Sequence, residues 1–261
     1  MKTIRSRDNP LVRQLIKLSG SSRARRLSAT TILDGEHLIE AYCEAAIDSL
    51  ELIVASETGM QRGAIADLMD RAAAREKVVI EDRLLAQVSQ VVTPSGILAV
   101  IKTPSAPDLP AQIEDGLYLE GIQDPGNLGS ILRTSLGAGI RRIYLSSGSV
   151  FAWSPKVIRA GMGAHFHLSI CENVELRDLS ERAACRIIAA QSAAATEIYD
   201  VDLSGPTTWM FGNEGAGLSR QALDVAGLRV VIPMAGHTES LNVAAAVAIC
   251  LFEQGRQRRI S

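Results

Sequence analysis

Short apolar segments alternate along the entire chain with segments whose apolar residues recur at helical spacing. A short apolar segment is typical of a buried strand, and the spacing i, i+3, i+4 is typical of an amphipathic helix. Strands that alternate with helices predict an α/β fold. In the first half the predicted strands are 31–34, 50–55, 77–80 and 96–101, and the predicted helices are 9–18, 36–46 and 64–74.

The second half repeats this alternation with short connections, which favours a mostly parallel sheet with helices on both faces. The predicted strands are 117–121, 142–145, 186–190, 208–211 and 229–232, and the predicted helices are 128–136, 155–159, 218–225 and 240–253. The last helix is apolar nearly all round and contains Ala244, Ala245, Ala246 and Ala248. Such a helix is predicted to be buried, in the interior or against a second subunit.

Residues 102–112 separate the two halves. They contain three prolines and no apolar period, and such segments resist both helix and sheet. We therefore expect a first domain over residues 1–101, a linker over 102–112 and a second domain over 113–261. No apolar run reaches the roughly 18 residues that a transmembrane helix needs, so no membrane span is expected.

Positive charge gathers at both ends of a chain whose formal net charge is only −2. Residues 1–27 hold eight basic side chains against one acid, Asp8. This distribution predicts an anionic partner such as nucleic acid, although a solvated face would also explain it. The candidate contact residues are Arg5, Arg7, Arg13, Lys17, Arg23, Arg25 and Arg26.

The cysteines and histidines do not form a metal-binding pattern. Four cysteines are scattered without the close pairs of a zinc site or a disulfide framework, so buried reduced thiols in a cytoplasmic protein are expected. These are Cys43, Cys171, Cys185 and Cys250. On a strand, His165 and His167 would share a face as metal ligands can, but no third ligand accompanies them and no metal is expected.

Three loops of the second half have unusual compositions, and each follows a predicted strand. In parallel α/β sheets, ligands bind at such strand ends. The loops are 121–133 (GIQDPGNLGSILR), 211–218 (FGNEGAGL) and 231–243 (VIPMAGHTESLNV). Their glycines let the backbone approach a ligand closely or adopt positive φ.

Each loop also has an ordinary explanation. Asn127 can cap the helix that follows it. The second loop lacks the lysine of a phosphate loop, and the Glu214 carboxylate would repel phosphate. Ser240 and Asn242 stand at a helix start, where capping is common and free N–H groups favour a carboxylate. His237 could act as a base but is interpreted as a residue at the rim of the site.

Together the three loops resemble the motifs of the TrmH (SpoU) family of RNA 2′-O-methyltransferases, within the SPOUT class. The pattern N-x-G-x-x-x-R stands at Asn127, Gly129 and Arg133, and G-N-E-G-x-G-L-S stands at 212–219. The third pattern, I-P-M-x-G followed by S-L-N-V-A and L-F-E, stands at 232–236, 240–244 and 251–253. The resemblance covers residues 116–255.

One segment departs from the family pattern. Members often carry R-A-S-x-G-A after the second strand of this domain, and in Arg159–Ala164 of this chain Gly161 takes the place of the serine. The front half resembles the small substrate-binding domain that precedes many family catalytic domains, through residues such as Asn9, Pro10 and Gly35.

The resemblance implies a SPOUT domain with a trefoil knot, preceded by a small α/β domain similar to a ribosomal-protein RNA-binding fold. It implies methyl transfer from S-adenosyl-L-methionine (AdoMet) to a ribose 2′-hydroxyl of RNA by a homodimer, with ribosomal RNA favoured. AdoMet would contact Gly212, Gly217, Ile232, Met234 and Leu241. The implied catalytic residues are Arg133, Asn127, Glu214, Ser240 and Asn242.

The resemblance places Arg133 near the reacting hydroxyl. Because the reference pKa of arginine is about 12.5–13.8, this side chain is a poor base. We expect Arg133 to hold an RNA phosphate and to stabilise the forming alkoxide, with the other four residues orienting it, the hydroxyl and the cofactor.

Three alternatives remain open: a transfer-RNA 2′-O-methyltransferase, a non-catalytic RNA-binding protein that keeps the fold, and a nucleotide-dependent enzyme of the Rossmann type. The second is disfavoured by the joint presence of the five implied catalytic residues. The third would need a glycine-rich turn after the first strand and an acidic residue about 20 residues later, and the sequence offers no such turn.

Overall fold

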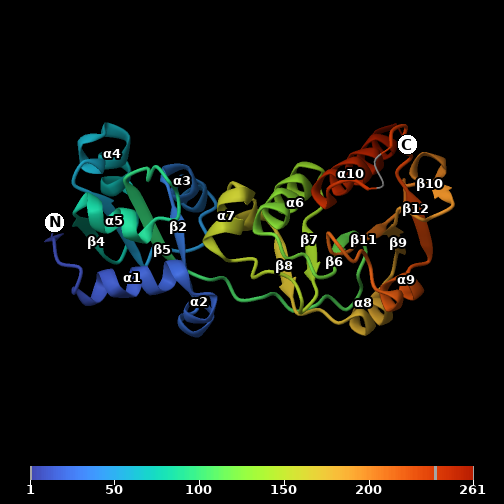
Figure 1. Ribbon diagram of the computed structural model, residues 1–261, viewed down its shortest axis with the longest axis horizontal. Coiled ribbons are helices and arrows are strands. Elements are labelled where there is room, and N and C mark those ends of the chain that lie inside the picture. The colour runs from blue at the N-terminus through green and yellow to red at the C-terminus, as the bar shows by residue number, and fades with distance from the viewer. Residues whose placement is uncertain (1, 238–239, 261) are drawn as a thin grey trace. The chain divides into compact units, whose positions relative to one another are not determined.

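The structure is a computed structural model of the 261-residue chain, and it describes residues 2–237 and 240–260. Its internal contacts divide the chain into two compact units (Figure 1). The first unit contains residues 1–105 and 153–166, and the second contains 106–152 and 167–261. The chain first passes from one unit to the other inside the proline-rich segment 102–112.

The first unit has a five-stranded mixed sheet in the order β1-β4-β3-β5-β2. Strands β1, β4 and β3 are parallel neighbours, whereas β5 pairs antiparallel with both β3 and β2. The strands are β1 (Lys2–Ile4), β2 (Thr30–Asp34), β3 (Leu52–Ser56), β4 (Lys77–Ile80) and β5 (Ile97–Lys102). The helices are α1 (Pro10–Gly20), α2 (Ser22–Ser28), α3 (Glu36–Glu44), η1 (Gly59–Gln61), α4 (Gly63–Arg71) and α5 (Asp82–Val88).

Helix α1 shows how local sequence sets an element of this unit. The Asn9 side chain accepts a hydrogen bond from the N–H of Leu11 (2.9 Å), and Pro10 occupies the first helical position, where its missing N–H costs nothing. One face of the helix is buried and the opposite face carries Arg13 and Lys17. The buried face consists of Val12, Leu15 and Leu18.

The segment 153–166 belongs to the first unit although it follows the second unit's first strands in sequence. Its helix α7 (Pro155–Gly161) lies against β2. The hydroxyl of Thr31 donates to the carbonyl of Trp153 (2.7 Å), and the guanidinium of Arg159 lies 4.0 Å from the largely buried carboxylate of Asp34. The predicted boundaries assign this segment to the second domain, and contacts between residues far apart in sequence explain the difference.

The second unit has a seven-stranded sheet in the order β10-β12-β9-β11-β6-β7-β8, and every neighbouring pair is parallel. The α/β fold with a parallel sheet is therefore confirmed. The strands are β6 (Gly116–Leu119), β7 (Arg142–Leu145), β8 (Ser169–Glu172), β9 (Arg186–Ala190), β10 (Thr196–Glu197), β11 (Thr207–Phe211) and β12 (Leu228–Val231).

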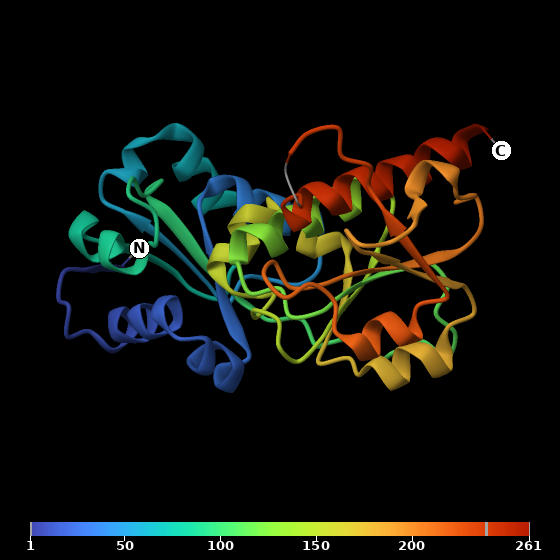
Figure 2. The same cartoon turned by 45° about the vertical axis from the view of Figure 1, so that its right-hand side comes forward.

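Helices cover both faces of this sheet. Helices α6 (Pro125–Gly137) and α10 (Val243–Ile260) pack together on one face, and α8 (Leu176–Arg182) and α9 (Arg220–Val225) lie on the other (Figures 1 and 2). Because all strands are parallel, their carboxyl ends share one edge, and the loops after them can meet there.

The last helix is buried along one side in the single chain, and burial of its other side against a second subunit stays a prediction. Val247, Cys250 and Leu251 are buried, and the indole N–H of Trp209 donates to Gln254 (2.8 Å). On the opposite side, Ala245 is exposed and Phe252 is 54% exposed. Side chains of the sheet cover one face of α10 and leave its other face uncovered.

Several short elements lie outside the predictions: β1, α2, α5, β8, α8 and β10. Each is too short for a period to be read with certainty. His165 and His167 lie in the 3-10 helix η2 (Ala164–His167), so they do not share a strand face. No described helix has the length and hydropathy of a bilayer span.

All four cysteines are free thiols, as the sequence predicts. Cys171 and Cys250 are buried and Cys185 is half-buried. Cys43 is exposed, so the expectation of burial is wrong for this residue, which lies on the outer side of the short helix α3.

Candidate active site

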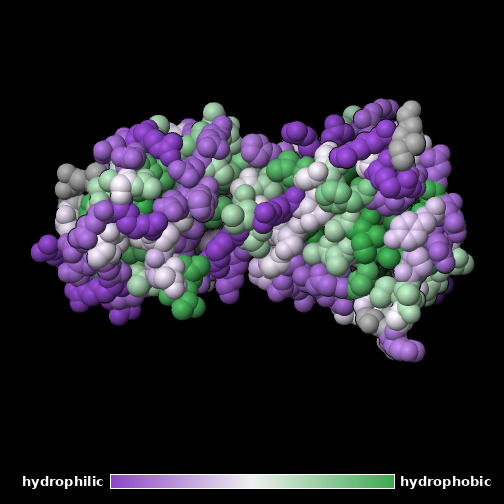
Figure 3. Space-filling model, turned by 90° about the horizontal axis from the view of Figure 1, so that it is seen from above, coloured by the Kyte–Doolittle hydropathy of each residue, from purple (hydrophilic) through white to green (hydrophobic). Residues whose placement is uncertain are grey.

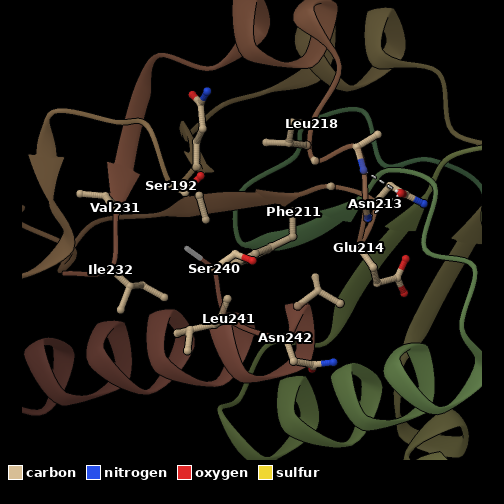
Figure 4. Close-up of a pocket in the computed structure, with 18 of the residues that line it drawn as sticks. Ser192, Phe211, Asn213, Glu214, Leu218, Val231, Ile232, Ser240, Leu241 and Asn242 are labelled. Atoms are coloured by element: carbon tan, nitrogen blue, oxygen red, sulfur yellow. Dashed lines mark hydrogen bonds between the residues drawn. The ribbon is translucent and has the colours of Figure 1, made fainter. Parts of the chain in front are cut away.

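A cavity of about 690 Å³ opens at the carboxyl edge of the seven-stranded sheet. The residues that follow β9, β11 and β12 form three of its sides, and the beginning of α10 forms another (Figure 4). Val231 and Ile232 lie toward one end, and Glu214 and Asn242 lie toward the other (Figure 4). The cavity lies within one unit and has the size of a cofactor site.

The loop 211–218 is closed on itself by two backbone hydrogen bonds, Asn213 N–H to Gly217 O (3.1 Å) and Gly217 N–H to Asn213 O (2.9 Å). A Cβ atom on Gly212 would lie 2.1 Å from the carbonyl carbon of Gly217, so no side chain fits there. Gly217 has φ of +70°, which only glycine adopts readily. These two glycines are required by the closed loop itself.

The side chain of Asn213 fixes the same loop from inside. Its carbonyl oxygen accepts hydrogen bonds from the N–H groups of Gly215 and Ala216 (2.9 and 3.0 Å). Its amide donates to the carbonyl of Gly121 (2.8 Å), at the end of β6. The second loop is thereby fastened to the first one.

Three polar side chains from the three loops form a continuous chain of hydrogen bonds. The Asn127 amide donates to the Glu214 carboxylate (3.0 Å), and the Asn242 amide donates to the Asn127 carbonyl oxygen (2.9 Å). The carbonyl oxygen of Asn242 accepts from the N–H of Ala244 and so caps α10 (2.9 Å). Residues separated by 87 and 115 positions in sequence are joined directly.

Asn127 does not cap α6. Asp124 is the capping residue, because its carboxylate accepts the N–H of Asn127 (2.7 Å). The side chain of Asn127 is consequently available for Glu214 and Asn242. The alternative that the sequence left open for Asn127, ordinary helix capping, is wrong.

Glu214 is held in its ionised form. Partial burial removes water from its carboxylate and acts to raise the pKa. Hydrogen bonds from the Asn127 amide and from backbone N–H groups, including that of Asp124, have the larger effect and lower the pKa of Glu214. A carboxylate with a lowered pKa is a weak base at neutral pH. Its chemical role is therefore to accept hydrogen bonds and to present negative charge.

Replacement of Glu214 by glutamine is expected to give a pH-dependent change in stability. The folded pKa of Glu214 lies below the ordinary glutamate value of about 4.3, so ionisation stabilises the fold above that pH, and this contribution is lost as the pH falls through the folded pKa. In thermal unfolding at neutral pH, the melting temperature of the wild type should exceed that of Glu214→Gln by a constant margin. The margin should shrink in acid, and a margin unchanged at every pH would contradict the assignment.

The cavity brings together eight of the predicted site residues. They are Gly212, Gly217, Ile232, Met234 and Leu241 of the predicted cofactor set, and Glu214, Ser240 and Asn242 of the predicted catalytic set. Asn127 does not line the cavity, but it is hydrogen-bonded to Glu214 and Asn242, which do. His237 is exposed in the third loop, and its place in the site stays a prediction.

Arg133 lies outside the cavity lining. It follows Asn127 by six residues on α6, which corresponds to about 9 Å along the helix axis. Its side chain is exposed and forms no hydrogen bond or ion pair with any residue of the described ranges. The guanidinium is therefore available to an anion that approaches α6 from solvent.

The sequence interpretation missed one segment of the cavity lining, which consists of Ala190, the last residue of β9, with Gln191 and Ser192 after it. They form no recognisable motif. The available signal was positional, because β9 is predicted correctly at 186–190 and every carboxyl end of a parallel sheet faces the same edge.

The basic side chains of the first unit differ in their surroundings. Arg7, Lys17 and Arg23 are exposed. Others are exposed but paired, as in the contacts of Arg5 with Glu57 (3.1 Å) and of Arg13 with Asp8 (2.7 Å). Arg26 is exposed and also has an interaction within the chain.

Arg25 is a correction to the candidate nucleic-acid contacts. It is only 6% exposed, and its guanidinium donates to the backbone carbonyls of Leu18 (2.5 Å) and Ser19 (3.1 Å) at the end of α1. Arg25 therefore fastens α2 to α1. Within the described residues no group of histidine, cysteine and acidic side chains has the arrangement of a metal site.

Comparisons with known proteins match the region of the three loops. The sequence profile of the SpoU rRNA Methylase family matches residues 116–252. An uncharacterized tRNA/rRNA methyltransferase of Synechocystis sp. is 33% identical to this chain, over 98% of the chain and 94% of the relative. The 23S rRNA (guanosine(2553)-2′-O)-methyltransferase RlmP of Bacillus subtilis is 28% identical, over 97% of this chain and 98% of the relative.

A solved structure is similar over nearly the whole length. The AdoMet-bound rRNA methyltransferase from Sinorhizobium meliloti has a TM-score of 0.82 and 26% sequence identity, and the similarity covers 98% of this chain and 97% of that chain. Similarity of this extent includes both units of the fold, whereas the family profile covers the second half.

Proposed function

From the premise that this chain belongs to the SpoU rRNA methylase family, we propose that it transfers a methyl group from AdoMet to a ribose 2′-hydroxyl of ribosomal RNA. The chain is a methyltransferase by its family. The observation that carries the proposal is the hydrogen-bonded series Glu214, Asn127 and Asn242, which joins all three family motifs beside one cavity.

The residues around the cavity fit AdoMet. The apolar side chains of Ile232, Met234 and Leu241 suit a flat adenine, and the backbone of the glycine loop 212–217 offers N–H and C=O groups. The beginning of α10 favours a carboxylate, and ionised Glu214 favours a nearby positive charge. AdoMet, when bound, supplies an electrophilic methyl group on a positively charged sulfur.

The chain's own residues position the RNA and stabilise charge. The exposed Arg133 side chain holds a phosphate of the RNA and stabilises negative charge that develops on the ribose oxygen. Glu214, Asn127 and Asn242 keep the first and third loops in register with the glycine loop. Ser240, which lines the cavity, offers one more hydroxyl toward the ligands.

Exposed cations of the first unit support an RNA partner. Arg7, Arg13 and Lys17 line a depression of the first unit together with Asp8, the partner of Arg13, and Arg23 adds another exposed cation on α2. Phosphate contacts of this kind supply affinity without base specificity. We assign substrate docking to this unit and chemistry to the second.

The proposed function is tested by transfer of labelled methyl groups. Wild-type protein should methylate ribosomal RNA isolated from cells that lack the gene, and mapping of 2′-O-methyl groups with and without the gene should reveal the target ribose. Labelling of transfer RNA instead would favour the alternative substrate. Absence of AdoMet binding in isothermal titration would favour a non-catalytic RNA-binding protein.

We further propose that the enzyme is a homodimer that uses the outer face of α6 and α10. Besides Arg133, exposed positions on α6 are small, such as Gly126, Ser130 and Gly137, and α10 exposes Ala245 and Phe252. Figure 3, a view toward this side, shows hydrophobic surface on the second unit. Small residues and one large aromatic anchor suit close packing of helices between subunits.

Replacement of Phe252 by glutamate should weaken this dimer. Loss of an aromatic anchor and burial of a charge are expected to raise the dissociation constant by roughly 30-fold or more, as for an interface hot spot of about 2 kcal/mol. Light scattering coupled to size exclusion would measure the change. Val92→Glu, at a fully exposed apolar position of the first unit, is the matched control and should leave the mass unchanged.

Two further features remain predictions of family membership and composition. The trefoil knot is expected in the C-terminal part of the second unit, where the glycine loop and the third loop enclose the cavity. A cytoplasmic location is expected from the free cysteines and from a ribosomal RNA substrate.

A further inference from the structure

The two faces of helix α2 are reversed relative to an ordinary amphipathic helix. Its buried residues are Ala24 and Arg25, whereas Leu27 is 79% exposed. Positions 25 and 27 lie about 200° apart around a helix axis, so the charged side chain takes the inner face and the apolar one the outer face. Arginine is rarely buried and leucine is usually buried. A local rule that is broken in this way is typical of a functional surface.

The reversed orientation of α2 is fixed by hydrogen bonds to α1. The guanidinium of Arg25 donates to two backbone carbonyls at the end of α1 (2.5 and 3.1 Å). Ser21 alone joins the two helices. Its N–H donates to the carbonyl of Lys17 (3.1 Å), and its hydroxyl accepts from the N–H of Ala24 (3.2 Å). The corner between the helices is therefore tight, and it holds Leu27 toward solvent.

The same corner carries positive charge that the first unit leaves unneutralised. No acidic residue occurs between Asp8 and Asp34, whereas this stretch holds five basic ones. Among the residues that the structure describes, Arg25 is bonded only to backbone carbonyls, and its Nε has no hydrogen-bond partner. Burial lowers the pKa of Arg25, and the charge of Arg26 lowers it further. A buried cation without a counter-ion is costly, so an anion bound outside α2 would be stabilised.

The outer face of α2 combines cations with an apolar side chain. Arg23, Arg26 and Leu27 stand at positions i, i+3 and i+4, which share one face of a helix, and all three are exposed. In Figures 1 and 2, α2 projects from the first unit beyond the end of α1. The chemistry that fits this face is an anion with an accessible apolar surface beside it.

An unpaired nucleotide of RNA has this chemistry. In a continuous RNA duplex the faces of the bases are stacked, and only phosphates, ribose hydroxyls and base edges are accessible. A bulged or single-stranded nucleotide presents the face of its base together with its phosphates. Apolar side chains on basic surfaces pack against bases in this way when the stack is interrupted.

We propose that the outer face of α2 binds an unpaired nucleotide of the RNA substrate, with Leu27 against the base and Arg23 and Arg26 on the flanking phosphates. This inference rests on the proposed function. It adds to general phosphate contacts a preference for one kind of RNA structure. Because Leu27 forms no hydrogen bond to a base edge, the preference is for the unpaired state and not for one base.

The test compares binding of the full chain to two RNA duplexes that differ only in one bulged nucleotide, by fluorescence anisotropy at a fixed salt concentration. The wild type should bind the bulged duplex roughly five- to tenfold more tightly, as burial of most of a leucine side chain allows. Leu27→Ser should bind both duplexes alike. Arg23→Gln should weaken binding to both, and should lower the slope of log affinity against log salt by about 1.

Val92→Ser is the matched control, because Val92 is another fully exposed apolar side chain of the first unit, and this variant should keep the preference. Leu27 is exposed, so its replacement should leave the fold intact, which an unchanged titration with AdoMet would show. Four results would each overturn the inference: equal binding of the two duplexes by the wild type, a preserved preference in Leu27→Ser, a lost preference in Val92→Ser, or Leu27-dependent sedimentation with phosphatidylserine vesicles. Methyl transfer to ribosomal RNA by the wild type would persist in these cases, so failure here is distinct from failure of the proposed function.

Discussion

Gly212→Ala is expected to reduce AdoMet affinity by roughly 10- to 100-fold. The added Cβ would lie 2.1–2.3 Å from backbone atoms of Gly217 and Leu218, so it cannot be accommodated by a side-chain rotation. The loop must open, and overpacking of this kind costs about 1–3 kcal/mol. Each 1.4 kcal/mol corresponds to about tenfold in affinity. Isothermal titration of the folded variant with AdoMet measures the effect.

The control for this prediction comes from the same loop. A Cβ atom on Gly215 would meet the side-chain oxygen of Asn213 at 3.6 Å, an ordinary contact, and Gly215 does not have positive φ. Gly215→Ala should therefore bind AdoMet nearly as the wild type does. Equal affinities for the two variants would show that closure of the loop is not required for the cofactor.

Arg133→Ala is expected to lower the turnover number by roughly 100-fold or more while leaving AdoMet affinity unchanged. The side chain does not line the AdoMet cavity, so its loss removes no cofactor contact. Loss of a single donor that stabilises a developing negative charge typically costs about 10²–10³ in turnover. Single-turnover methyl transfer to RNA and AdoMet titration, measured on the same preparation, separate the two effects.

Two further substitutions define the role of Arg133. Arg133→Lys keeps the charge but loses the bidentate geometry, so partial activity is expected. Activity of the Arg133→Lys variant close to that of the wild type would exclude a special role for the guanidinium. Arg141→Ala is the control, because Arg141 is exposed just before β7, at the opposite edge of the sheet from the cavity, and its removal should leave turnover unchanged.

Local patterns were sufficient for many elements of the fold. Strands 77–80, 142–145 and 186–190 have the predicted bounds, because a short apolar segment between polar turns favours a buried strand that ends where the turns begin. Short elements escaped the same reasoning. The strand 169–172 and the helix 176–182 are too brief for a period, and their conformation is set by the neighbours on which they pack.

The sequence alone identified three loops of the candidate site, because glycines and polar residues after strands express a local requirement of the backbone, but it did not identify the segment at the end of β9. Tertiary structure decided how those residues are used. Asn127 joins Glu214 and Asn242 instead of capping its helix, and Arg25 is buried beneath α1. The segment 153–166 packs with the first unit. Each of these outcomes depends on contacts that no local pattern encodes, because the order of strands in the sheets and the packing of helices decide which distant residues meet.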